Sequence, residues 1–250
     1  TVICHAQSVK FEWVKQMGGT KADGGKDIAI DAAGNVFSTG FFTGTVDFDP
    51  GPGIFNLTAP LTNEEDIFIT KFDDAGNFIW AKQISGNFLD VTHSIKLDAQ
   101  GNIYLTGIFF SICDFDPGPG IFNLVSAGNE DIFIAKLNAS GNFLWAKRMG
   151  SGRFDRGNYI SLDAVGNLYV TGFFLETVDF DPGPAVYNLT AEGGEDMFIA
   201  KFDFAGNFIW VKQMGGLLFE GGYSIEISAS GNIYTAGIFL GTSDFDPSAS

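Results

Sequence analysis

The residues most suited to chemistry form a short acidic motif, Asp-Phe-Asp-Pro-Gly, that recurs along the chain. It is complete at 47–51, 114–118 and 179–183, and it recurs without the glycine at 244–247. In an extended segment residues i and i+2 point the same way, so both aspartates of a motif would face one side while the phenylalanine faces the core. Carboxylate pairs before a Gly/Pro turn suit a hard cation such as Ca²⁺. The predicted metal ligands are Asp47, Asp49, Asp114, Asp116, Asp179 and Asp181.

Calcium is the one cofactor that the sequence suggests, and a second interpretation of the motif stays open. Two carboxylates fall short of the roughly six to eight oxygens that calcium takes. Thr58 also stands where an EF-hand loop starting at Asp47 would need a glutamate. The alternative is that the aspartates cap turns by accepting hydrogen bonds from nearby backbone N–H groups. A second recurring acid has the same two interpretations, turn former or metal ligand; it is Asp23, Asp90, Asp155 and Glu220.

Aromatic and basic residues supply the candidate ligand-binding positions. Tryptophan recurs before Ala/Val-Lys at Trp13, and at the three candidates Trp80, Trp145 and Trp210. Exposed rings at these positions could stack on sugars, whereas buried rings would pack one sheet against the next. All three arginines fall within 148–156. Of these, Arg153 and Arg156 could dock a partner that carries carboxylate or sulfate groups, or could lie in an ordinary solvated loop.

These motifs sit in a repeat of about 65 residues. The turn glycines Gly34, Gly101, Gly166 and Gly231 are spaced by 67, 65 and 65 residues, and the tryptophans share that spacing. Each repeat holds two pairs of short apolar runs around a Gly-containing turn, which is typical of two β-hairpins. Runs such as 66–70 and 78–80 are apolar on both faces, as in sheets that are buried on both sides. The sequence therefore predicts an all-β fold, a β-propeller of four-stranded blades, with four blades' worth in this chain.

The repeated segments 94–107 (SIKLDAQGNIYLTG) and 131–150 (DIFIAKLNASGNFLWAKRMG) resemble the SBBP repeats of bacterial secreted propellers. They are also similar to NHL-type blades, whose inner strand runs into the same D-x-x-G-N turn. The resemblance spans almost the whole chain and implies a propeller that is secreted or displayed on the bacterial cell surface. The long DFDPGPG connection and the high phenylalanine content depart from that family pattern.

The repeat divides the chain as a single propeller domain, 1–250. Residues 18–84, 85–149 and 150–214 are predicted to form three blades, and 215–250 the inner strands of a fourth. Residues 1–17 would supply the outer strands that close this last blade, with a strand over Phe11–Met17. Two alternatives stay open: residues 1–8 could instead be the tail of a signal peptide, and the four blades could be a window of a larger ring or array.

Composition narrows the classes of function. A net charge of −16 disfavours binding to nucleic acid or to anionic lipid, and no apolar run is long enough for a membrane helix. No G-x-S-x-G, H-E-x-x-H or Walker motif is present, so we expect no enzyme. Two cysteines are too few for a disulfide framework.

We therefore expect a secreted or cell-surface module, without catalytic activity, for binding, adhesion or structural assembly. Its partners would be proteins or glycans at the repeated loops, and self-assembly is also compatible. Three alternatives remain: a propeller lectin with glycan pockets, a segment of a long repeat adhesin or extracellular filament, and a glycan hydrolase or lyase. The last would need an asymmetric cluster, for which His93, Arg153 and Arg156 are the nominees.

Overall fold

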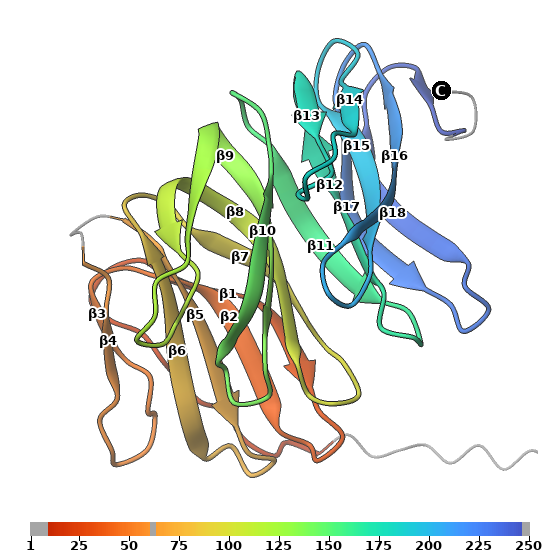
Figure 1. The fold of residues 1–250 in the computed structure, drawn as a ribbon. Coiled ribbons are helices and arrows are strands. Elements are labelled where there is room, and N and C mark those ends of the chain that lie inside the picture. Colours follow the sequence, from red (N-terminus) through yellow and green to blue (C-terminus); the bar gives the residue numbers. More distant parts are fainter. Residues whose placement is uncertain (1–9, 61–63, 247–250) are drawn as a thin grey trace, which may run out of the picture.

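The computed structural model describes residues 10–60 and 64–246, and within these ranges the fold is all-β with no helix (Figure 1). The absence of any helix in the described part means that none there could span a membrane. The strands are β1 (Asp23–Ile30), β2 (Val36–Phe42), β3 (Thr45–Asp47), β4 (Asn56–Thr58), β5 (Asp66–Phe72), β6 (Phe78–Gly86), β7 (Val91–Leu97), β8 (Ile103–Asp114), β9 (Asn123–Leu137), β10 (Phe143–Met149), β11 (Arg156–Leu162), β12 (Leu168–Phe174), β13 (Thr177–Asp179), β14 (Asn188–Thr190), β15 (Asp196–Phe202), β16 (Phe208–Gly216), β17 (Glu220–Ile227), β18 (Ile233–Phe239) and β19 (Ser243–Asp244).

The strands pair antiparallel in the order of the repeat. Unit 1 is β1-β2-β5-β6 and unit 3 is β11-β12-β15-β16, with the short outer hairpins β3–β4 and β13–β14. In unit 2, β7-β8-β9-β10, the same hairpin is continuous with the longer strands β8 and β9. Unit 4 consists of the pair β17–β18, and β19 pairs with the end of β16.

The D-x-x-G-N turns explain why the first hairpin of each unit forms. The carboxylate of Asp98 accepts hydrogen bonds from the backbone N–H of Gln100 at 3.0 Å and of Asn102 at 2.8 Å. Gly101 takes a φ of 78°, which glycine adopts without steric cost. The other units repeat these bonds, except that Ser228 replaces the aspartate in unit 4. The predicted turn chemistry is confirmed.

Burial follows position within a unit. The third strand β5 is buried at nearly every residue, and the second strands β8 (at 103–109) and β12 are buried along both faces. This confirms the prediction of sheets covered on two sides. The fourth strand is different: in β6 buried and half-exposed residues mix, since this strand lies at the outer edge of its unit. We expected Ile79 to be covered on both faces, but it is exposed.

The units follow one another side by side in chain order (Figure 1). Their inner strands β1, β7, β11 and β17 contact each other in succession. Adjacent units are also joined by pairing, because the end of β6 pairs with β8 and the end of β16 with β19. This arrangement is consistent with a β-propeller, although no closed sheet is found in the described part of the chain.

The chain start differs from the prediction in one respect. No strand is assigned over Phe11–Met17, because these described residues have no ladder-forming neighbour. Trp13 nevertheless occupies a repeat position: its indole N–H donates to the carbonyl of Asp74 in unit 1 at 3.1 Å. The alternative interpretations of residues 1–8 lie outside the described residues, and the domain boundaries and ring closure stay predictions.

Candidate functional site

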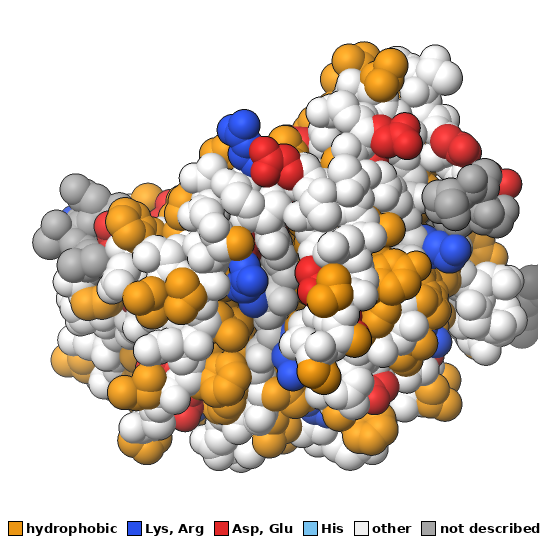
Figure 2. All heavy atoms as spheres, turned by 45° about the horizontal axis from the view of Figure 1, so that its top comes forward, with side chains coloured by type: hydrophobic (Ala, Val, Ile, Leu, Met, Phe, Trp, Pro, Cys, Tyr) orange, Lys and Arg blue, Asp and Glu red, His pale blue; other side chains and the backbone are white. Residues whose placement is uncertain are grey.

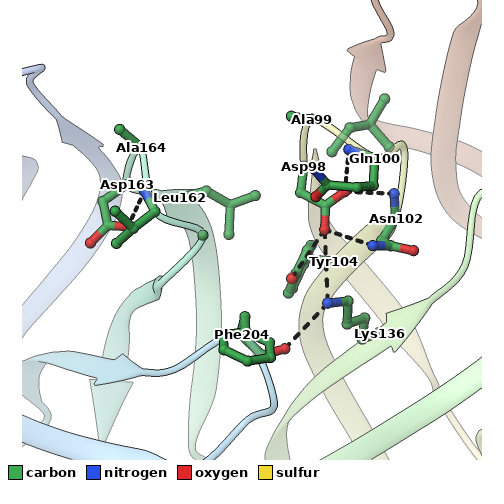
Figure 3. Close-up of a pocket in the computed structure, with 13 residues that line it drawn as sticks. Asp98, Ala99, Gln100, Asn102, Tyr104, Lys136, Leu162, Asp163, Ala164 and Phe204 are labelled. Carbon is green, nitrogen blue, oxygen red and sulfur yellow. Dashed lines mark hydrogen bonds and ion pairs between the residues drawn. The ribbon is translucent and has the colours of Figure 1, made fainter.

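A hollow with a volume of about 580 Å³ lies between units 2 and 3 (Figure 3). The turn of unit 2, with Asp98 and Gln100, forms one side, and the turn of unit 3, with Asp163 and Ala164, forms the other. Lys136 and Phe204 lie between the two turns. The hollow therefore has acidic rims and a mixed basic and aromatic base.

Lys136 is held in place by three groups. Its ammonium lies 3.8 Å from the carboxylate of Asp98, 4.6 Å from the centre of the Tyr104 ring, and it donates to the carbonyl of Phe204 at 3.2 Å. The cation over the aromatic face is a favourable electrostatic contact. Burial raises the pKa of Tyr104, so its phenol stays protonated and donates to Asp98. Units 1 and 3 repeat this trio as Lys71, Asp31, Phe37 and as Lys201, Asp163, Tyr169.

The rim carboxylate Asp163 keeps its charge. Burial acts to raise its pKa, but hydrogen bonds from Asn167 and Val165 and the charge of Lys201 outweigh burial, so the pKa is lowered. The carboxylate is therefore ionised at neutral pH. It pairs with Lys201 at 3.7 Å and lies on the side of its turn away from Asp98 (Figure 3). Both rim carboxylates are thus paired with a lysine of their own unit.

Phe204 breaks the symmetry of the repeat. The equivalent positions in units 1 and 2 are Asp74 and Ala139. Phe204 is 62% exposed, and Val165, on another turn of the same unit, is 77% exposed. Both line the hollow, so this junction presents apolar surface that the repeat itself does not require.

The aspartates of the DFDPG motif brace turns. The Asp47 carboxylate accepts from the backbone N–H of Asp49 at 3.0 Å and of Phe55 at 2.8 Å, and Asp49 accepts from Gly51 at 2.8 Å. The equivalent hydrogen bonds are accepted in the other two complete motifs by Asp114, Asp116, Asp179 and Asp181. Phe48 is buried as predicted. Within 10–60 and 64–246 no three His, Cys, Asp or Glu side chains are arranged to hold a metal ion. The turn interpretation accounts for these bonds, and calcium at this motif stays untested.

The tryptophans pack between and within units. Trp80 and Trp145 are half-buried, with ring centres 6.0 Å from Phe37 and 6.3 Å from Tyr104. Each also lies against the turn glycine of the following unit, Gly141 or Gly206. Trp210 makes the equivalent contact with Tyr169 at 6.0 Å. The packing interpretation fits these contacts, and the lectin alternative gains no support from them.

The basic nominees are already paired. Arg156 makes two hydrogen bonds to Glu130, at 2.6 and 3.1 Å, and Arg153 makes one to Glu176 at 2.9 Å. His93 Nδ1 lies 3.0 Å from the carbonyl oxygen of Gly157. Burial lowers the pKa of His93 to about 4, so the ring is neutral at pH 7. The Arg156 and His93 contacts join units 2 and 3, whereas the Arg153 contact lies within unit 3. The three residues are thus not gathered into the acid–base cluster that a hydrolase would need.

Sequence reasoning missed the residues of the hollow. The D-x-x-G-N pattern indicated only turn formers at Asp98 and Asp163, and the lysine that follows each third-strand apolar run went unnoticed. The substitution of Phe204 into a repeat position that is otherwise Asp or Ala was a visible signal. On the face shown in Figure 2, Lys and Arg side chains lie singly among hydrophobic and uncharged ones, with no broad basic patch.

No known family profile matches the chain. The chain is similar to a WD repeat-containing protein. It is 26% identical, over 260 residues and 91% of its length, to the uncharacterized WD repeat-containing protein L264 of Acanthamoeba polyphaga mimivirus. It is 23% identical, over 148 residues and 59% of its length, to the regulatory protein FlaEY of Caulobacter vibrioides. The chain spans 19% and 15% of these relatives.

The similarity to the WD repeat-containing protein and the all-β structure together indicate a repeat protein of the β-propeller type. They do not support the SBBP type, secretion or adhesion. The level of identity is low, so the similarity bears on the architecture of the repeat and not on individual site residues.

Proposed function

We propose that this chain forms four-stranded blades of a β-propeller that binds a protein partner without catalysing a reaction. The observation that carries this proposal is the hollow between units 2 and 3, which is lined by the exposed residues Phe204 and Val165. The likeness to a WD repeat-containing protein supports the propeller and, at a distance, an interaction role. The blade count and ring closure belong to this proposal.

The hollow favours a short partner segment with a basic side chain next to an apolar one. The rims carry Asp98 and Asp163, and the chain as a whole has a net charge of −16. The net negative charge of the chain would attract a guanidinium or ammonium group of the partner, while an apolar neighbour of that group covers Phe204. Lys136 is bound to Asp98 and to the Phe204 carbonyl, so it positions the base of the hollow.

A peptide-display selection on the purified chain tests the proposal. We expect enriched peptides that pair Arg or Lys with an apolar residue, and we expect Phe204→Ala combined with Val165→Asp to weaken their binding at least tenfold. Val186→Asp is the matched control, because Val186 is also exposed, at 68%, but lies outside the hollow. Equal binding to the hollow variant and to the control would reject the hollow as the partner site.

No observation favours the glycan hydrolase or the lectin over this function. The secreted or surface location and the adhesive role remain proposals from the sequence resemblance alone.

A further inference from the structure

Each junction between successive units buries two carboxylates. One begins the third strand in units 1 and 3 and holds the equivalent position within β9 in unit 2, and the other precedes or begins the inner strand of the next unit. The pairs are Asp66 with Asp90, Asp131 with Asp155, and Asp196 with Glu220. All six side chains belong to residues that are at most 1% exposed. The backbone N–H groups of Asp90, Asp155 and Glu220 donate to the carbonyls of Glu65, Glu130 and Glu195, at 2.8, 2.9 and 2.7 Å. Each acceptor is the residue just before the first acid of its pair, so the two acids of a pair lie close together. In each pair, the charge of one acid also raises the pKa of the other.

The middle junction, between units 2 and 3, supplies a cation and a hydroxyl group. Arg148 forms an ion pair and a hydrogen bond with Asp131. Ser151 donates to Asp155 from its hydroxyl at 2.8 Å and also from its backbone N–H, and Leu175 N–H donates to the other oxygen at 2.9 Å. The guanidinium charge offsets one carboxylate, and both oxygens of Asp155 have partners.

The outer two junctions lack the cation. Gln83 and Gln213 stand at the position of Arg148, and each donates a neutral amide N–H to its aspartate. Gly86 and Gly216 stand at the position of Ser151. In the junction between units 3 and 4 a hydroxyl comes from another residue, Ser243, which donates to Glu220 at 2.6 Å. Because the glutamine amides are neutral, the outer junctions lack the positive charge that Arg148 gives to the middle junction.

Unpartnered oxygens mark the two outer junctions. Asp90 Oδ2, Asp196 Oδ1 and Glu220 Oε2 are buried without a hydrogen-bond partner. A buried carboxylate oxygen without a partner is costly, so its presence calls for a compensating group. The middle junction leaves one such oxygen, Asp131 Oδ1, but there the arginine supplies the charge.

We propose that the junctions between units 1 and 2 and between units 3 and 4 each bind a hard cation of the calcium class. In the middle junction Arg148 provides the positive charge instead. Asp66 and Asp90 would hold the first ion, and Asp196 and Glu220 the second. The charge of Glu64 adds to the first site. These sites are distinct from the DFDPG aspartates and go beyond the proposed partner binding. Because each site has only two carboxylates, we expect a weak affinity, with Kd about 10⁻⁴–10⁻³ M.

Exchange of Gln and Arg between junctions provides the test. Equilibrium dialysis of the chelator-stripped chain against CaCl₂ should count two bound ions, and calcium should raise the thermal midpoint. Gln83→Arg should remove one ion, Gln83→Arg with Gln213→Arg should remove both, and Arg148→Gln should add a third. The double arginine variant should unfold in chelator at or above the midpoint of the calcium-loaded wild type, which also shows that it folds.

A control variant and a pH titration show where the ion binds and whether a proton takes its place. The triple variant Asp49→Asn, Asp116→Asn and Asp181→Asn should still bind two ions, because it alters only the DFDPG motif. Calcium that binds equally to the double arginine variant would overturn the proposal. So would a wild type that binds no calcium but takes up protons between pH 8 and pH 5, since the pairs would then each hold a proton instead of a metal ion.

Discussion

At the residue scale, most acidic side chains accept hydrogen bonds from backbone N–H groups. A few buried carboxylates lack enough hydrogen-bond donors or positive charge around them. Asp47 and Asp98 illustrate the first kind, since their oxygens accept from two N–H groups each. Asp66 illustrates the second. Burial raises its pKa to about 7, whereas the pKa of Asp131, which is buried similarly but lies beside Arg148, is raised only to about 6. The same type of residue at equivalent positions thus differs through one partner.

The raised pKa of Asp66 predicts how stability depends on pH in metal-free buffer. A carboxyl group whose folded-state pKa is raised stabilises fully below its ordinary pKa of 3.8, and that contribution is lost as pH rises through about 7. The free energy of unfolding should therefore fall as the pH rises from about 4 to about 7. Asp66→Asn should flatten this slope in chemical denaturation series, and Asp73→Asn, at an exposed turn, should leave the slope unchanged. An Asp66→Asn slope equal to that of the wild type would refute the assignment.

At the element scale, every inner strand carries a β-bulge, and the bulges of β7 and β11 link units. The extra residue is His93 in β7 and Asn158 in β11. Asn158 donates to the carbonyl of Gly222 at 2.8 Å in the next unit, as His93 meets the carbonyl of Gly157. In β7 and β11 the bulge thus turns one side chain toward the next unit, which gives His93 a structural role.

The bulge also requires glycine on the second strand. A methyl group on Gly107 would overlap the carbonyl oxygen of Val91 in the paired inner strand. We expect Gly107→Ala to lower the free energy of unfolding, measured by denaturant titration, by about 1–3 kcal/mol. Gly25→Ala is the control, since its methyl group would meet open space, and it should stay within about 0.5 kcal/mol of the wild type. Similar losses in both variants would contradict the close approach.

The sequence was most informative at this scale. The turn glycines, the two hairpins and the third strands buried on both faces follow from local chemistry and from apolar runs, and these features are present. The sequence did not reveal that Gln83 and Arg148 meet Asp66 and Asp131, because those contacts span 17 positions and depend on strand register. Similarly, Phe204 becomes a site residue only when the turns of two units face each other.

At the scale of the whole molecule, function is expected where the repeat is broken. Equivalent acids, lysines and tryptophans mostly hold units together, as Trp145 and Lys136 do. The departures are few: Phe204 in the hollow, and Arg148 with Ser151 in the middle junction. All of them lie around units 2 and 3, which places both the partner proposal and the difference in charge compensation near the same part of the chain.

The central claim is that the chain is a succession of equivalent four-stranded units, and amide hydrogen exchange tests it most directly. We expect the slowest exchange at equivalent positions of β2 and β5, β8 and β9, and β12 and β15, repeating at the period of about 65 residues, and faster exchange in the exposed β18. Protection that is confined to one unit, or that ignores the period of the repeat, would contradict the claim.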